Sequence, residues 1–249
     1  MKLNYLSASR IKTFEQCGLK YFGIYEEGLE DSPHPLTIMG SAVHKGAEDS
    51  MNEIIAGREA SFTSAVRQAC AQMGVTKPNA DLARELIENA LSWGYTRNAD
   101  KCVGLEVSFF EALPCGTKVK GFIDRLDIDL PTADVIDLKT QKSAFNDATL
   151  ADEWQSVVYN WAARKLYPEL TGDISVSYWV LRHRVQRVWM TADDAKRGED
   201  KLMKVAEQIR SCTDPQPQPT ALCQWCPKRG TCPAANEGVK ARFNRKFKK

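Results

Sequence analysis

The chain has 249 residues, of which 43% are hydrophobic and 27% are charged, with a formal net charge of +2. This balance is typical of a soluble protein with enough residues for one large or two small domains. The small net charge excludes a globally basic protein that would attract nucleic acid through its overall field.

The N-terminal stretch MKLNYLSASRIKTFEQC lacks an apolar core region and a small-residue cleavage site, so no signal peptide is expected. No segment approaches the ~18 consecutive apolar residues of a membrane span. We therefore expect a cytoplasmic protein with no membrane partner. In that reducing compartment the eight cysteines should be thiols or metal ligands rather than disulfides. After Glu237 the tail GVKARFNRKFKK is basic, either a solvated end or a segment that contacts phosphates.

Helical periodicity dominates the first part of the chain. Ser7 or Ser9 is placed to cap a first helix that runs to about Leu19. Apolar residues then recur at helical spacing from Met39 to Ile55. Two more helices are expected, over 61–73 and 80–97.

The period changes after residue 100. Leu105, Val107 and Phe109 alternate with more polar residues, as expected for a strand. The result is an α/β prediction, a small mixed sheet flanked by helices. The expected elements are strands at 105–109, 119–123 and 133–139, a helix at 151–167, a hairpin at 174–190 turning near 182–184, and a helix at 192–210.

Two aspartates mark the predicted sheet. Asp124 lies thirteen residues before Asp137, and a turn near Pro131 would bring them together on neighbouring strands. Two adjacent carboxylates repel, and a divalent cation such as Mg²⁺ or Mn²⁺ relieves the repulsion. Lys139 shares the strand face of Asp137 and adds a positive charge there. An ordinary strand salt bridge is the alternative for this Asp-x-Lys pair. Asp127 and Asp129 are spare acids on the strand that carries Asp124, and they are expected to be solvated charges at its end.

The segment GFIDRLDIDLPTADVIDLKT resembles the core of the PD-(D/E)XK nuclease superfamily, specifically its RecB-like branch. That resemblance implies a restriction-endonuclease-like core and hydrolysis of DNA phosphodiester bonds by metal-activated water. It also assigns roles to four residues. Asp124 is a metal ligand, Asp137 is the second acid, Lys139 is the catalytic lysine, and the backbone carbonyl of Leu138 faces the metal.

Four further residues match motifs of the same branch. GSAVHKGAE resembles its G-x-x-x-H motif, which makes His44 a metal ligand with Glu48 one turn further on. Glu106 resembles the acid on the strand before the core, with a catalytic or metal-orienting role. Gln155 and Tyr159 resemble its Q-x-x-x-Y motif and are expected to contact DNA. From the residues alone, the favoured interpretation of His44 is a structural or surface histidine, Glu106 is an exposed strand charge, and Tyr159 is the edge of a core.

Three cysteines are closely spaced as C-x₂-C-x₅-C, at Cys223, Cys226 and Cys232. A metal site needs a fourth ligand, for which Cys212 and Cys17 are the candidates. The arrangement of Cys17 with the three resembles the iron–sulfur nucleases of the same branch, including CRISPR-associated RecB-like exonucleases and the AddB-type nuclease domain. There the four cysteines hold a structural [4Fe-4S] cluster that joins the chain ends. On chemistry alone thiolates suit zinc equally, and Gly18 departs from the proline that commonly follows the first cysteine. The isolated cysteines are expected to be small buried or surface residues, at Cys70, Cys102 and Cys115.

The resemblance as a whole implies one RecB-like nuclease domain over 1–249. Its expected parts are a cluster segment (1–38), a helical part (39–103), a nuclease core (104–190) and a C-terminal helix with the cysteines and basic tail (191–249). The expected activity is a freestanding, phage or CRISPR-linked exonuclease acting on single-stranded DNA or DNA ends. A homo-oligomer, or a recombination or helicase partner, is compatible with this. The alternatives are a catalytically inactive DNA-binding or assembly module of the same fold, and an electron carrier built on the cluster.

Overall fold

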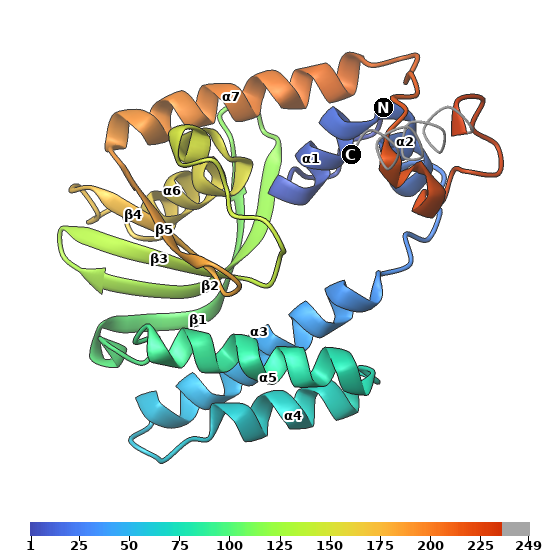
Figure 1. Cartoon of the computed structure of the whole chain (residues 1–249). Helices are drawn as coiled ribbons and strands as arrows, with labels where there is room; N and C mark the ends of the chain where they lie inside the picture. Colours follow the sequence, from blue (N-terminus) through green and yellow to red (C-terminus); the bar gives the residue numbers. More distant parts are fainter. Residues whose placement is uncertain (236–249) are drawn as a thin grey trace. The chain divides into compact units, whose positions relative to one another are not determined.

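The computed structural model describes residues 1–235 (Figure 1), and the basic tail considered above lies outside them. The chain folds into two compact units. Unit 1 contains Met1–Ser32, Phe110–Lys120 and the chain from Glu199 onward, whereas unit 2 contains Pro33–Phe109 and Gly121–Gly198. The division into one nuclease domain with four parts stays a prediction. Within the described residues, no helix is long and apolar enough to cross a membrane.

Unit 2 begins with three helices, α3 (Pro35–Ile55), α4 (Phe62–Gln72) and α5 (Lys77–Ser92). They bury their apolar stripes against one another and against a face of the sheet that presents Ile136, Leu138 and Trp179. Gly46 lets α3 and α4 approach closely, because a Cβ there would lie 2.5 Å from a Val66 methyl carbon.

The sheet has five strands in the order β1-β2-β3-β4-β5. β2 pairs antiparallel with β3, β3 pairs parallel with β4, and β4 pairs antiparallel with β5. The predicted α/β class with a mixed sheet is therefore confirmed, as is the predicted hairpin. The strands are β1 (Cys102–Ala112), β2 (Lys118–Asp129), β3 (Thr132–Lys139), β4 (Ile174–Val180) and β5 (Arg184–Met190).

The parallel pairing of β3 and β4 requires a crossover, which contains the short 3₁₀ helix η2 (Asp147–Asp152) and α6 (Trp154–Leu166). Successive side chains of a strand point to opposite faces. Consequently Ile136 and Leu138 face α3–α5, whereas Asp137 faces α6 and accepts a hydrogen bond from Tyr159. The sheet thus lies between two helical layers, an arrangement that places Asp137 deep under α6.

Unit 1 contains α1 (Ala8–Gln16), α2 (Gly18–Tyr25), most of α7 (Ala192–Ser211) and the short 3₁₀ helix η3 (Ala221–Trp225). Ser7 caps α1, since its hydroxyl accepts a hydrogen bond from the backbone N–H of Arg10. The predicted first helix to Leu19 is instead two helices. Cys17 is extended (φ −169°) and its Sγ accepts a hydrogen bond from the Lys20 N–H, so one residue ends α1 and caps α2.

The other helix predictions differ from the structure mainly at their ends. The helix expected to reach residue 97 ends at Ser92, and Gly94 follows in a left-handed conformation (φ +90°). The helix expected from residue 151 begins at Trp154, because the preceding turn is 3₁₀. Helix ends depend on such local caps rather than on the apolar period.

Candidate active site

Three predicted site residues from three separate elements of unit 2 meet at one point. His44 comes from α3, Glu106 from β1 and Asp124 from β2. One ligand atom of each lies within 4.8 Å of the other two, and His44 Nδ1 is 3.2 Å from Asp124 Oδ2. The same Asp124 oxygen accepts a hydrogen bond of 2.8 Å from the Leu138 N–H. Two carboxylates and one imidazole therefore form a donor set suited to a divalent cation.

An unusual backbone conformation brings Glu106 into this group. Its φ is +45°, in the left-handed region that side chains other than glycine rarely adopt. Such a residue within a strand redirects its side chain and costs about 1–3 kcal/mol. Backbone strain of this kind is typical of functional positions, and here it occurs at the acid that joins His44 and Asp124 in one group.

Asp137, the second predicted acid, has a different environment. Its side chain is 1% exposed and does not join the three-residue group among the described residues. Oδ1 accepts hydrogen bonds from Tyr159 Oη (2.8 Å) and Gln155 Nε2 (3.2 Å), while Oδ2 forms an ion pair with Lys139. Gln155 Nε2 also donates to Tyr159 Oη. The two residues predicted to contact DNA therefore hold Asp137, and Tyr159 is buried.

The charges of the site perturb one another strongly. Burial lowers the pKa of His44, but the carboxylate of Asp124 more than compensates and raises it to about 9. Burial raises the pKa of Asp124, and His44 and Lys139 outweigh that effect and lower it below its usual range. The pKa of Glu106 is raised by burial and by Asp124. Burial raises the pKa of Asp137 despite its ion pair with Lys139. A cation would relieve this concentration of negative charge.

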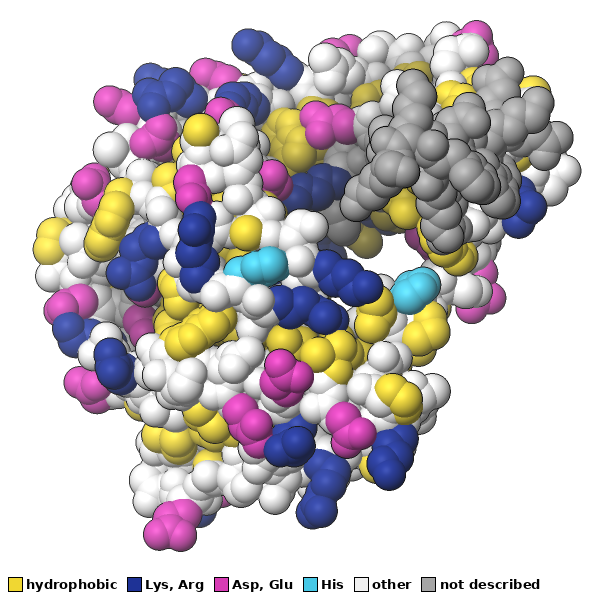
Figure 2. Space-filling view, viewed as in Figure 1, with side chains coloured by type: hydrophobic (Ala, Val, Ile, Leu, Met, Phe, Trp, Pro, Cys, Tyr) yellow, Lys and Arg dark blue, Asp and Glu magenta, His cyan; other side chains and the backbone are white. Residues whose placement is uncertain are grey.

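The group opens into a cavity of about 760 Å³ in unit 2. His44, Glu106, Asp124 and Lys139 line it together with the Leu138 position, and Lys45, Lys142 and Arg182 contribute positive charge. On the face shown in Figure 2, basic and acidic side chains are interspersed over the helical part.

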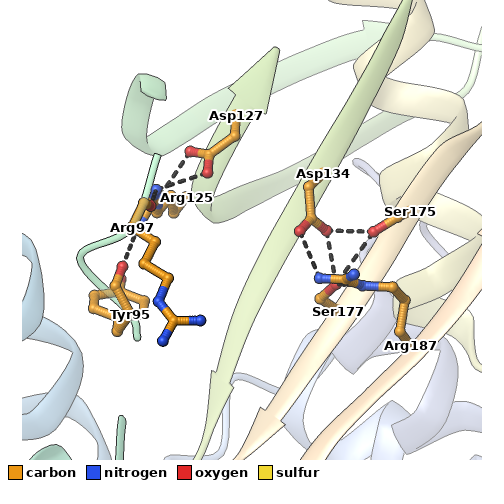
Figure 3. Close-up of polar contacts among 8 residues, drawn as sticks. All are labelled: Tyr95, Arg97, Arg125, Asp127, Asp134, Ser175, Ser177 and Arg187. Carbon is orange, nitrogen blue, oxygen red and sulfur yellow. Dashed lines mark hydrogen bonds and ion pairs between the residues drawn. The ribbon is translucent and has the colours of Figure 1, made fainter. Parts of the chain in front are cut away.

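A buried arginine next to Asp124 is a feature that the sequence analysis did not assign. Arg125 is fully buried, and its Nε and Nη2 donate hydrogen bonds of 2.7 Å to the two oxygens of Asp127 (Figure 3). It also donates to the backbone carbonyls of Tyr95 and Arg97. Arg125 thereby ties β2 to the segment that follows α5. The Asp-Arg-x-Asp spacing was the available signal, because one strand face carries residues 125 and 127.

The spare acids lie away from the cavity, since neither lines it. Asp129 forms an exposed ion pair with Lys101. Asp127 is buried against Arg125, so the prediction of a solvated charge was wrong at this position because the guanidinium replaces water as its partner. A separate polar cluster crosses β3, β4 and β5, where Asp134 accepts hydrogen bonds from neighbouring side chains (Figure 3). The donors are Ser175, Ser177 and Arg187.

The four predicted cluster cysteines line one pocket within unit 1. They come from the α1–α2 junction and from the segment around η3. Among the described residues, no three of their Sγ atoms lie within 4.8 Å of one another. The four that line the pocket are Cys17, Cys223, Cys226 and Cys232. None of the eight cysteines of the chain forms a disulfide.

Backbone amides point at two of these sulfurs. Cys17 Sγ accepts hydrogen bonds of 3.4 Å from the N–H groups of Lys20 and Gln218. Cys223 Sγ accepts one of 3.2 Å from the N–H of Thr220. Amide donors of this kind stabilise thiolates and tune iron–sulfur centres.

Cys212, the other candidate for a fourth ligand, does not line this pocket. Cys70 is buried in the core of α3–α5, and Cys115 Sγ lies 3.2 Å from the hydroxyl of Thr117. Cys102 contacts the Gly104 carbonyl. One isolated cysteine thus packs in the core, and the other two contact a nearby hydroxyl or carbonyl group, as small residues commonly do.

Comparison with known proteins gives a family match over most of the chain. The sequence model of the PD-(D/E)XK nuclease superfamily matches residues 5–233. No curated protein matches. A candidate exonuclease from Eubacterium rectale has a similar solved structure, with 16% identity, a TM-score of 0.58, and 90% of this chain and 87% of that chain covered. The structure of SSO0001 gives 14% identity and a TM-score of 0.49, covering 94% and 88%. At these identities the likeness to solved structures concerns the fold alone.

Proposed function

Because the chain belongs to the PD-(D/E)XK nuclease superfamily, we propose that it is a divalent-metal-dependent deoxyribonuclease. We propose further that it acts as a cytoplasmic exonuclease of the RecB-like branch, on single-stranded DNA or DNA ends. The observation that supports this best is the meeting of His44, Glu106 and Asp124 beside Lys139 in one cavity. A metal-dependent nuclease needs ligands for a cation, a charged group near the phosphate and room for DNA, and the cavity offers a candidate for each.

The donor set fits Mg²⁺ or Mn²⁺. His44, Glu106 and Asp124 would hold the ion, with Asp137 and the Leu138 carbonyl as the further ligands that the superfamily motif assigns. When bound, such an ion lowers the pKa of water and stabilises negative charge on a phosphate. The Asp124–His44 contact of 3.2 Å fixes the imidazole against the carboxylate, so that both donors remain oriented toward the same point.

The remaining groups position charge and protons. Lys139 lines the cavity and carries an ammonium that would face a phosphate oxygen and neutralise charge developing on it. Asp137 holds that ammonium in place through their ion pair. Tyr159 and Gln155 in turn fix Asp137 through its other oxygen. We propose that these two residues position Asp137, and that any contact of theirs with DNA is secondary.

The cavity favours an anionic polymer as substrate. Lys45, Lys142 and Arg182 line the same cavity as the acids, so phosphates on either side of the scissile bond would find positive charge. Arg182 is oriented by a hydrogen bond of 2.9 Å from its Nε to the Thr140 carbonyl. A homo-oligomer, or a helicase or recombination partner, would extend this positively charged surface. We also propose a phage or CRISPR-linked setting for the enzyme.

We also propose that Cys17, Cys223, Cys226 and Cys232 hold a structural [4Fe-4S] cluster. Four thiols around one pocket, with amide donors to two of them, support a metal centre. Thiolates suit zinc as well as iron. It is the resemblance of this cysteine arrangement to the iron–sulfur nucleases of the RecB-like branch that favours the [4Fe-4S] cluster. Its role would be to tie distant parts of unit 1 together.

One observation favours the alternative of a catalytically inactive DNA-binding module. Asp137 Oδ2 contacts Lys139 and not the group formed by His44, Glu106 and Asp124. If that ion pair kept Asp137 from binding the cation, turnover would be limited. The two functions differ in one measurable way, because an inactive module binds DNA with no metal-dependent cleavage.

The nuclease proposal is tested with purified protein, end-labelled single-stranded DNA and Mn²⁺ or Mg²⁺. We expect degradation by the wild type and at least a hundredfold less by Lys139→Ala and Asp124→Ala, since each removes a charge from the reacting centre. Asp129→Ala is the matched control, because Asp129 is an exposed acid on the same strand as Asp124. Equal degradation by all four proteins would refute the assigned site. A covalently closed single-stranded circle resists an exonuclease and is cut by an endonuclease.

The cluster proposal has its own measurement. Anaerobically purified protein should contain iron and sulfide and show broad absorbance near ~400 nm. Cys232→Ser should lose most of that absorbance, whereas Cys115→Ser, which changes a cysteine outside the pocket, should keep it. Colourless protein with stoichiometric zinc would contradict the assignment.

A further inference from the structure

A second surface with the chemistry of nucleic-acid binding lies in unit 1, where no catalytic acid is found among the described residues. It arises because residue 6 pairs in parallel with Val119 at the start of β2. The Leu6 N–H donates to the Lys118 carbonyl (2.7 Å), and the Lys120 N–H donates to the Leu6 carbonyl (2.8 Å). Leu6 and Val119 are buried. Alternation along a strand therefore directs the side chains of Lys118 and Lys120 outward.

Aromatic rings alternate with cations on this surface. The Tyr5 and Phe110 rings meet edge to face, with centroids 6.5 Å apart at 77°. Lys118 Nζ lies 5.7 Å from the Phe110 ring and Lys120 Nζ lies 5.6 Å from the Tyr5 ring. The Arg10 guanidinium covers Tyr5 at 3.8 Å. We call these five residues the Tyr5 surface.

The Tyr5 surface is positively charged and exposes an aromatic face. Within residues 1–235, none of its three cations forms an ion pair with a carboxylate, whereas Lys20, Lys45 and Arg84 each do. Phe110 is 54% exposed, although a phenylalanine is usually buried. An ordinary solvated strand explains the two lysines. It does not explain why the exposed Phe110 ring packs edge to face against the Tyr5 ring beside them.

We propose that the Tyr5 surface binds single-stranded DNA, with phosphates on Lys118 and Lys120 and a base stacked on Phe110. A positive surface with an accessible ring is the common design of proteins that bind single strands. Bases in a duplex are already stacked, so only an unpaired strand can place a base on Phe110. The choice of DNA rests on the proposed function, but the binding itself needs neither the metal nor the catalytic residues.

The test measures binding without cleavage. Full-length protein carrying Lys139→Ala is titrated, in EDTA, against a fluorescent oligothymidylate of ~20 nucleotides at several salt concentrations. Phe110→Ala should weaken binding about 5- to 160-fold, the range that corresponds to losing one stacked base, with the salt dependence unchanged. Phe110→Leu keeps apolar bulk without a π face and should bind as poorly, whereas Phe110→Trp should restore binding.

The lysines have a separate signature. Lys118→Ala with Lys120→Ala should weaken binding and reduce the slope of log K against log salt by about 1.4, because each phosphate of a single strand that is no longer neutralised changes the slope by ~0.7. Lys204→Ala, an exposed lysine elsewhere in unit 1, is the control and should bind as the parent does. Circular dichroism melting of each variant excludes loss of folding as the cause of weaker binding.

Two results would overturn the proposal. The first is parental binding by the Phe110→Ala and double-lysine variants. The second is an equal loss of duplex and single-strand binding in Phe110→Ala. If the wild type fails to cleave DNA yet the variants lose single-strand binding as described, the proposed nuclease activity fails and the Tyr5 surface stands. If it cleaves and the variants bind normally, the opposite holds.

Discussion

Removing the buried Arg125 guanidinium should destabilise unit 2 severely. Arg125→Leu leaves Asp127, which is 7% exposed, as a buried acid without its partner. It also leaves the Tyr95 and Arg97 carbonyls without their donor. Breaking a buried pair from one side costs about 3–5 kcal/mol, which is a large part of the roughly 5–15 kcal/mol stability of a typical domain. We expect the free energy of unfolding to fall by about 3–5 kcal/mol.

The double variant Arg125→Leu/Asp127→Leu separates the charge penalty from the reduced packing. Once the carboxylate is also removed, the uncompensated charge disappears, and the double variant should recover ~1–3 kcal/mol relative to Arg125→Leu alone. Urea unfolding followed by circular dichroism gives the four free energies of the cycle. A decrease below about 1 kcal/mol for Arg125→Leu would refute the view that Arg125 stabilises unit 2, and simple additivity in the cycle would refute its energetic coupling to Asp127.

Three further predictions concern the site. In metal-free protein the His44 pKa is raised from 6.5 to about 9 by its pairing with Asp124. The contribution of this pairing to the free energy of unfolding is therefore fully present below pH 6.5 and is lost as the pH rises through 9. The NMR signals of His44 should titrate with a midpoint near 9, and a midpoint near 6.5 would contradict the pairing. Glu106→Gly should relieve the strain of the positive φ and raise the free energy of unfolding by up to about 1 kcal/mol. The same variant should bind Mn²⁺ more weakly, as measured by calorimetry. An unchanged Mn²⁺ affinity would show that Glu106 is not a metal ligand. Tyr159→Phe removes a hydrogen bond to Asp137 and should cost about 1 kcal/mol in urea unfolding and lower nuclease turnover; wild-type values for both would show that Asp137 needs no support from α6.

Much of the fold could be predicted because local patterns encode it. Alternation predicted β1, β2 and β3, and helical spacing predicted α3 and the helix that became α6. These patterns indicate which face of an element is buried, because the apolar residues of a buried face recur at the repeat of the helix or strand. The same alternation places Lys139 on the strand face of Asp137, where the two form an ion pair.

The site depends on contacts between residues that are far apart in the chain. No local pattern states that His44 lies 3.2 Å from Asp124, or that Glu106 reaches them through a φ of +45°. Propensity does not encode a rare backbone state that the surrounding packing imposes. The resemblance to a family suggested the residues, but it did not indicate that Gln155 and Tyr159 would contact Asp137.

The amino-acid sequence by itself determined which residues alternate, which cap a helix, and which acids and thiols were available. Only the tertiary structure decided which of them meet. Asp124 and Asp127 illustrate the difference, since they lie three residues apart on one strand. Asp124 faces the cavity beside His44, whereas Asp127 is neutralised by Arg125 on the opposite face. A sheet has two faces, and what packs on each face decides whether an acid contributes to a candidate metal site or to a structural ion pair.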